Sequence, residues 1–163
     1  MSRLSTIAHK IRHRKNPNDE FITPEELAKK LINLVPLENG DSVLDSAVGT
    51  GVFYRNFPKY TKNYETNDFF NWNKNVDWII TNPPYSKLDR WLEYSCKIAI
   101  KGFAYLLALH NLTPRRIELC EERGFGITKI HLCKVFKWFG ISSFIIWEKN
   151  KKGIIEYDRV VWR

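Results

Sequence analysis

The sequence predicts one α/β domain, built on a mostly parallel, doubly wound sheet that ends in an antiparallel hairpin. Two observations support this prediction. Short apolar runs alternate with helical patterns through most of the chain, and the last apolar runs follow one another without a helix between them. Alternation is typical of parallel sheets, whereas consecutive strands are typical of hairpins. A length of 163 residues suits a single hydrophobic core, so we expect one domain over 1–163.

Four helices are expected from capping residues and apolar periodicity. The first covers about residues 24–35, where Thr23 is a suitable N-cap, Pro24 suits the first helical position, and Pro36 ends the pattern. The others are predicted in "GVFYRNF" (51–57), in "SKLDRWLEYSCKIAI" (86–100) and in "TPRRIELCEERG" (113–124), with Thr113 as cap, Pro114 at the first position and Gly124 as C-terminal stop.

Strands are expected at five apolar runs: "SVLD" (42–45), "NVDWII" (75–80), "GFAYLLAL" (102–109), "GITKIHLCKVF" (126–136) and "SSFIIWEK" (142–149). A brief strand is also expected in "NYE" (63–65), and the tail from Gly153 onward could add another. The segment between the first of these strands and Asn82 is short and polar, with little room for a full helix. The sheet is therefore expected to be reduced in this region.

The net charge of +8 favours a polyanionic partner, although a basic surface can also be simply solvated. A basic cluster lies between His9 and Lys15, in a polar arm over residues 1–20. No apolar run reaches the roughly 20 residues that a membrane span needs. The three cysteines are widely spaced, which argues against a disulfide framework and a zinc site. We expect a cytoplasmic protein without a metal or a membrane partner.

Two loops fall where ligands bind in such sheets, at the carboxyl ends of the strands. The first is "DSAVGTG" (45–51), whose glycines allow a ligand to approach the backbone and whose Asp45 can accept from an ammonium group or hydroxyls. By itself this loop is weak support for a nucleotide-like ligand, since an ordinary strand-to-helix turn can have the same sequence. The second loop is "TNPPYS" (81–86).

The "NPPY" stretch suits a planar group that carries an exocyclic amine. The amide oxygen of Asn82 and the backbone carbonyl of Pro83 are acceptors, and Tyr85 offers a ring for stacking. Two acceptors would stabilise positive charge on a poorly nucleophilic aromatic amine as it attacks, without a strong base. The alternative is a turn that ends a strand, because Pro83 and Pro84 both interrupt regular structure.

Three motifs in a fixed order carry a family resemblance: "FxTP" (21–24), "DxxxGxGxF" (45–53) and "NPPY" (82–85). In this order the chain resembles the S-adenosylmethionine-dependent amino-methyltransferases that act on adenine N6 in DNA, over roughly residues 16–148. The compact layout also resembles small methyltransferases encoded by bacteriophages. The resemblance implies a Rossmann-like class I methyltransferase three-layer sandwich and direct in-line methyl transfer with no covalent intermediate.

The same resemblance implies roles for individual residues. Asn82 and Pro83 would hold the target amine, with Pro84 beside them, and Tyr85 would stack on the flipped base. The cofactor would contact Phe21, Thr23, Pro24, Asp45, Ala47, Gly49, Gly51, Glu65, Asp68 and Phe69. Within that set, Glu65 would bind the ribose hydroxyls, Asp68 would accept from the adenine amine, and Phe69 would pack on that ring. Phe136, Trp138 and Phe139 would lie against the target base.

Several alternatives stay open. Glu65 and Asp68 could be solvated loop acids, Phe69 and Phe70 could belong to the core, and the aromatics of 136–139 could form a hydrophobic plug. His110 could face the cleft, although a structural histidine is the simpler interpretation. The basic arm could touch phosphates or be a solvated tail.

No separate target-recognition domain is evident in the sequence, whereas DNA methyltransferases of this subgroup usually carry one. Either a few loops suffice, or a separate recognition subunit supplies the base readout, or the substrate is single-stranded or structured nucleic acid. Adenine N6 in DNA is the leading substrate. The alternatives are adenine in RNA, a protein glutamine amide, or a non-catalytic nucleic-acid-binding subunit.

Overall fold

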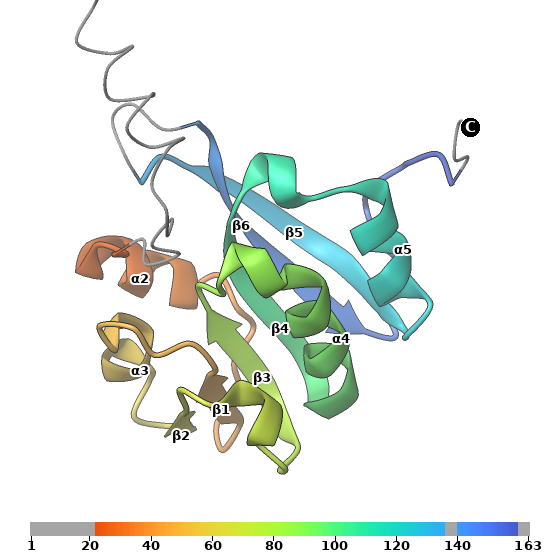
Figure 1. Cartoon of the computed structure of the whole chain (residues 1–163). Coiled ribbons are helices and arrows are strands. Elements are labelled where there is room, and N and C mark those ends of the chain that lie inside the picture. The colour runs from red at the N-terminus through yellow and green to blue at the C-terminus, as the bar shows by residue number, and fades with distance from the viewer. Residues whose placement is uncertain (1–21, 136–139, 160–163) are drawn as a thin grey trace, which may run out of the picture.

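The computed structural model describes residues 22–135 and 140–159, and it contains one six-stranded sheet in the order β2-β1-β3-β4-β6-β5 (Figure 1). The pairs β1–β2, β1–β3 and β3–β4 are parallel, while β6 is antiparallel to both β4 and β5. The predicted doubly wound sheet with a C-terminal hairpin is therefore confirmed. The strand bounds are β1 Ser42–Asp45, β2 Lys62–Glu65, β3 Val76–Thr81, β4 Ala99–Ala108, β5 Phe125–Cys133 and β6 Ser142–Lys149.

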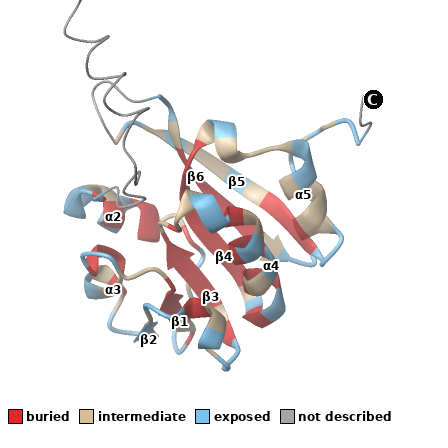
Figure 2. Cartoon of the chain, in the orientation of Figure 1, coloured by how far each residue is buried: buried red, intermediate tan, exposed pale blue. Residues whose placement is uncertain are grey.

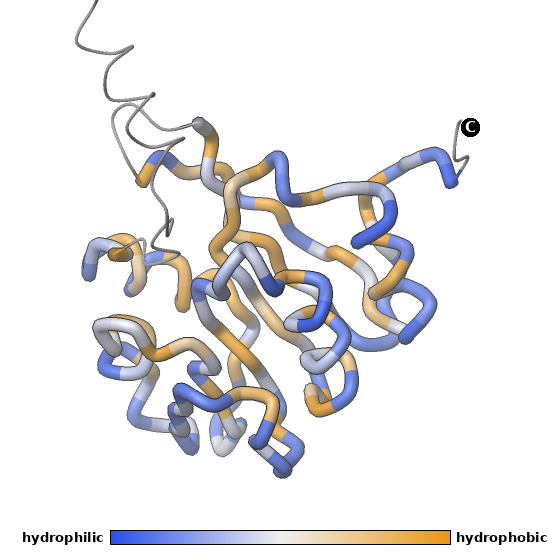
Figure 3. Tube along the Cα trace, in the orientation of Figure 1, coloured by the Kyte–Doolittle hydropathy of each residue, from blue (hydrophilic) through white to orange (hydrophobic). Residues whose placement is uncertain are grey.

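Helices cover both faces of this sheet, which makes the predicted three layers. One face carries α2 (Glu25–Ile32) and α3 (Val52–Asn56), and the other carries α4 (Leu88–Ile98) and α5 (Pro114–Glu121). Successive residues of a strand point to opposite faces, so Trp78 packs on the α2 side and Ile79 on the α4 side. The central strands are accordingly buried (Figure 2) and hydrophobic (Figure 3) along most of their length.

The helix starts confirm one predicted cap and correct another. Thr113 caps α5 by accepting from the backbone N–H of Arg116, and Pro114 is the first helical residue, as expected. The prediction that Thr23 caps the first helix is wrong. The N-cap position of α2 is Pro24, with no side-chain cap, because the chain enters the helix one residue later and the Thr23 hydroxyl bonds elsewhere.

The connection from β1 to β3 is as short as the sequence predicts. It holds one short helix (α3), the four-residue strand β2 and a single 3-10 turn, η1 (Phe69–Asn71). The brief strand expected at 63–65 is present as β2, at the edge of the sheet. Strand β1, which precedes the glycine loop, and β3, which ends at Thr81 just before Asn82, are direct neighbours in the sheet.

The carboxyl ends of β1, β2, β3 and β4 define one edge of the sheet, which we call the carboxyl edge. The end of β5 and the start of β6 lie at the same edge, since Ala108 at the end of β4 pairs with Ser142, which also pairs with Cys133. The predicted substrate aromatics Phe136, Trp138 and Phe139 lie outside the described residues, as do Phe21 and the basic arm.

The described part of the tail, residues 150–159, adds no strand to the sheet and instead folds back across the start of β5. The N–H of Ile154 donates to the carbonyl of Ile127 at 2.9 Å. A Cβ at Gly126 would lie 2.2 Å from the carbonyl oxygen of Lys151, so only glycine allows the tail to pass this closely.

Candidate active site at the carboxyl edge

The loop after β1 has the backbone conformation that its glycines predict. Gly49 and Gly51 have φ angles of 50° and 76°, in the left-handed region that glycine adopts without strain. Gly51 also holds the N-cap position of α3, and Gly49 and Thr50 are exposed. An added Cβ at Gly49 would meet only one atom within 4 Å, the Ala47 carbonyl oxygen at 3.9 Å. At Gly49 the loop thus presents bare backbone to a ligand, whereas Gly51 is buried, with Nη1 of Arg55 3.3 Å from the position of an added Cβ.

Asp45 is buried beneath this loop, with 1% of its surface exposed. Its Oδ1 accepts from the Thr81 hydroxyl at 2.8 Å and from the Ala47 N–H at 3.3 Å. Its Oδ2 is buried without a hydrogen-bond partner of normal geometry among the described residues. Burial raises the pKa of Asp45 to about 6, against the lowering effect of the hydrogen bond from Thr81. A buried carboxylate beneath the loop suits a cationic ligand above it.

The end of β3 brings two distant motifs together. The side-chain amide of Asn82 donates from Nδ2 to the hydroxyl oxygen of Thr23 at 3.4 Å, across 59 positions of sequence. Thr23 is 5% exposed, so this contact is enclosed. Pro83 is buried, while Pro84 and Tyr85 are half-buried, and Tyr85 packs on the α4 side of the core. The structure therefore places the "TP" of the first motif against the Asn of the third.

Two positioning contacts in this region were not predicted from the sequence. Thr81, which is fully buried, donates to Asp45 and accepts from the N–H of Ala47 at 3.1 Å. Ser46 accepts from the indole N–H of Trp91 at 3.0 Å, which ties the loop to α4. A hydroxyl residue at the last position of a buried strand is the one sequence signal that could have pointed to Thr81.

The two acids predicted to bind the ribose and adenine of the cofactor, Glu65 and Asp68, lie at and just after the end of β2, beside β1 and its glycine loop. Glu65 is exposed at the end of β2, directly opposite Asp45 in the parallel register. Asp68 is also exposed and accepts from the side-chain amide of Asn71 at 2.7 Å. The N–H of Thr66 donates to the Asp45 carbonyl, so the turn after β2 is attached to β1.

Phe69 lies in the core rather than on open surface. It is 1% exposed, and its ring centroid lies 5.0 Å from those of both Trp91 and Tyr94. Its neighbour Phe70 is half-buried beneath Arg90, whose guanidinium carbon lies 3.9 Å from the ring centroid. The structure thus agrees with the alternative that Phe69 is a core residue.

Exposed cations gather on the opposite half of the same edge. Lys87 follows the "NPPY" loop, Arg115 lies in the first turn of α5, and Lys134 follows β5, whereas Arg90 lies over Phe70 beside the acids. His110 is exposed after β4, which leaves it on the surface of this edge. Arg116 is already paired, since its Nε lies 2.6 Å from a carboxylate oxygen of Asp89.

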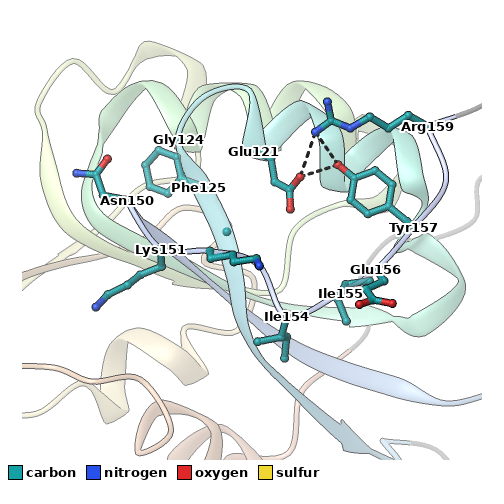
Figure 4. Close-up of a pocket in the computed structure, with 13 residues that line it drawn as sticks. Glu121, Gly124, Phe125, Asn150, Lys151, Ile154, Ile155, Glu156, Tyr157 and Arg159 are labelled. Atoms are coloured by element: carbon teal, nitrogen blue, oxygen red, sulfur yellow. Dashed lines mark hydrogen bonds and ion pairs between the residues drawn. The ribbon is translucent and has the colours of Figure 1, made fainter.

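A separate hollow of about 890 Å³ lies under the tail, near the amino ends of the strands (Figure 4). Its wall includes Glu121, which accepts from the hydroxyl of Tyr157 at 2.6 Å and pairs with Arg159. It contains none of the predicted site residues, and it is a space between the folded-back tail, α5 and β5.

Within residues 22–135 and 140–159, no cluster of three or more His, Cys, Asp or Glu side chains could hold a metal ion. No helix in the same ranges is long and apolar enough to cross a membrane.

No protein-family model and no curated protein matches the sequence, whereas many solved structures match the fold. One is a chain of the E. cuniculi Mtq2–Trm112 complex, responsible for methylation of the eRF1 translation termination factor. It has a TM-score of 0.61 at 19% identity, over 82% of this chain and 99% of that one. Another is the N-methyltransferase NodS from Bradyrhizobium japonicum WM9 with S-adenosyl-L-homocysteine, with a TM-score of 0.62 at 9% identity, over 92% and 100%.

A third match is the 23S rRNA methyltransferase ErmE, with a TM-score of 0.59 at 11% identity, over 85% of this chain and 73% of that one. At these identities the likeness is one of fold. The chain therefore has the Rossmann-like fold of these methyltransferases, and the predicted fold class is confirmed by shape as well as by topology. The acceptors of the three proteins differ, so the fold does not select a substrate.

Proposed function

We propose that this protein is an S-adenosylmethionine-dependent methyltransferase that acts on the N6 amine of adenine in nucleic acid, with DNA as the leading substrate. The observation that carries the proposal is the meeting of Thr23, Asn82 and the Asp45–Gly51 loop at one edge of the sheet. They come from three separate motifs, and the contacts of Thr23 with Asn82 and of Thr81 with Asp45 join them.

The residues over β1 and β2 fit the cofactor. S-adenosylmethionine, when bound, supplies a methyl group on a positively charged sulfur. Gly49 offers exposed backbone in a left-handed conformation, and Glu65 offers an exposed carboxylate that can accept from two adjacent ribose hydroxyls. Buried Asp45 adds negative charge under the loop, which favours a cationic ligand. Asp68 would accept from the cofactor's adenine amine.

The residues after β3 fit the target amine. The Nδ2 of Asn82 donates to the Thr23 hydroxyl, and the amide oxygen would be the first acceptor for the substrate amine. The Pro83 carbonyl would be the second acceptor, with its direction restricted by the proline ring. The two acceptors would favour the developing positive charge on the amine, which is preorganised electrostatic stabilisation. Tyr85 would stack on the base, with Phe136, Trp138 and Phe139 as further candidates.

The nucleic-acid substrate is supported by charge. Exposed Lys87 follows the loop that would hold the base, and exposed Arg115 and Lys134 lie at the same edge of the sheet, where cations can neutralise phosphates. The chain as a whole also carries a net charge of +8. DNA is favoured over RNA only by the order of the motifs.

Methylation of a protein amide is the second candidate, and a specific comparison favours it. Among the quoted structures, the chain of the complex that methylates eRF1 has the highest identity, at 19%. An "NPPY" loop can hold a side-chain amide by the same two acceptors. That complex also has two components, so a partner subunit is proposed for this chain as well under either candidate.

The test is methyl transfer from labelled S-adenosylmethionine to duplex DNA, single-stranded DNA, RNA and a lysate of intact proteins in parallel. Nucleosides from each nucleic acid are then identified by mass spectrometry. We expect N6-methylated adenine that disappears in Asn82→Ala. Label confined to protein would support the second candidate, and no transfer to any acceptor, although S-adenosylhomocysteine binds, would contradict both.

A further inference from the structure

We infer that Thr81 is a positioning residue, whose buried hydroxyl sets the target-amine loop against the cofactor loop. This inference rests on the proposed function, because it assumes that the loop after β1 binds the cofactor. It adds a role for a residue that belongs to none of the three sequence motifs.

The geometry around Thr81 is that of a bridge between two strands. Its hydroxyl donates to Oδ1 of Asp45 at 2.8 Å and accepts from the N–H of Ala47 at 3.1 Å, so it acts as donor and acceptor at once. Thr81 is 0% exposed and Asp45 is 1% exposed, so water does not compete for these bonds. A hydrogen bond to a charged acceptor in such a place is among the stronger ones.

The bridge is adjacent to both predicted binding elements. Asn82 follows Thr81 directly, and Ala47 begins the glycine loop that continues to Gly51. The backbone of Thr81 is itself held in the sheet by pairing with Tyr105 of β4. A single side chain therefore links the position of the Asn82 amide to the position of the cofactor loop.

The same bond acts on the charge of Asp45. Among the described groups, Glu65 on β2 is the charged residue that acts on this carboxyl, and it raises the pKa, as burial does. The hydrogen bond from Thr81 lowers the pKa, together with the backbones of Ala47 and Tyr54. Loss of the Thr81 hydroxyl would raise the pKa further, so more of Asp45 would be protonated at neutral pH.

The experiment compares Thr81→Val with Thr81→Ser in the full chain. Valine keeps the branched shape and removes the hydroxyl, whereas serine keeps the hydroxyl. Binding of S-adenosylhomocysteine is measured by calorimetry from pH 5 to pH 8, with thermal unfolding in parallel. We expect Thr81→Val to bind roughly 10-fold or more weakly at neutral pH, with the acid-side loss of affinity moved to higher pH. Thr81→Ser should keep the pH midpoint of the wild type.

The outcomes separate this inference from the proposed function. If the wild type does not bind S-adenosylhomocysteine, the proposed function fails. If the wild type binds and Thr81→Val binds equally well with the same pH profile, the role of Thr81 is contradicted. A purely structural role would lower the melting temperature without moving the pH midpoint. Should the valine variant not fold, a shifted midpoint in Thr81→Ser would overturn the inference, and an unchanged one would support it.

Discussion

The two halves of the carboxyl edge differ in charge although one sheet builds both. Over β1 and β2 the edge carries Asp45, Glu65 and Asp68, and the cation nearest the loop, Arg55, is engaged with the carbonyl of Thr50. Over β3, β4 and the hairpin, the edge carries the exposed cations Lys87, Arg115 and Lys134, while Arg90 lies over the ring of Phe70, beside the acidic half. The boundary between the halves falls between β1 and β3, which are neighbouring strands.

This difference indicates two ligands of opposite charge at one site. A sulfonium cofactor with ribose hydroxyls suits the acidic half, and a phosphate backbone suits the basic half. Asn82 and Thr81 lie at the boundary, where a methyl group would pass from one ligand to the other. If the two halves bind different ligands, substitutions in one half should leave binding to the other unchanged.

The largest effect is expected at the boundary. Asn82→Ala removes one acceptor for the amine and should lower the rate of methyl transfer by about 10²–10³-fold, in the range measured for loss of one preorganised partner. Binding of S-adenosylhomocysteine should change little, because the loop after β1 is untouched. Asn33→Ala, an exposed position at the end of α2, is the matched control. Equal losses of rate and cofactor affinity would mean that the loop as a whole has collapsed.

The second largest effect is expected from a substitution in the acidic half. Glu65→Gln keeps the size of the side chain and removes its charge, so affinity for S-adenosylhomocysteine should fall by roughly 10-fold, the effect of losing a charged acceptor. Affinity for nucleic acid should not fall. Glu26→Gln on α2, also exposed, controls for the change in net charge. Unchanged cofactor affinity in Glu65→Gln would identify Glu65 as a solvated acid.

Substitutions in the basic half should change the affinity for nucleic acid and its dependence on salt concentration. The double variant Lys87→Ala/Arg115→Ala should weaken nucleic-acid binding by several-fold and reduce the slope of log affinity against log salt by about 1–2. Lys151→Ala/Lys152→Ala removes the same charge from the tail, near the amino ends of the strands, and serves as the control. If both pairs have equal effects, net charge rather than this half of the edge drives binding.

The smallest effect is on stability and its pH dependence. Because the pKa of Asp45 is raised to about 6, the folded state binds this proton more tightly than the unfolded chain. Its stabilising contribution is therefore complete below the ordinary pKa and is lost as the pH rises through about 6. Asp45→Asn should unfold a few degrees higher than the wild type at neutral pH and at a similar temperature near pH 3.5, while binding the cofactor more weakly. A variant that melts lower at neutral pH would contradict this interpretation of Asp45.

Much of the fold could be predicted because it follows from local pattern. Alternating apolar runs gave the sheet and its hairpin, and capping chemistry gave the start of α5. The same reasoning gave a wrong prediction at Thr23, because threonine before proline is a residue type that often caps a helix. Its hydroxyl is instead used 59 positions away, by Asn82. Side-chain partners across the sheet are not encoded in a local window.

The candidate site was predicted in part for the same reason. The glycine loop and the proline loop can be recognised from the sequence, because glycine allows unusual backbone angles and proline interrupts regular structure. Their proximity follows from the sheet topology. Thr81 and the contact between Ser46 and Trp91 depend on which residues of neighbouring strands come into register, so no local pattern shows them. An aromatic residue such as Phe69 could pack on a ligand or in the core, and the sequence does not distinguish the two. The fold places Phe69 in the core.

The most direct test is a crystal structure of the full chain with S-adenosylhomocysteine. We predict that the ribose hydroxyls lie within hydrogen-bond distance of the Glu65 carboxylate, over the Gly49–Gly51 turn. The sulfur should face the side chain of Asn82. A ligand bound in the hollow beneath the tail, or bound at the carboxyl edge with its ribose away from Glu65, would contradict the division of this edge into a cofactor half and a substrate half.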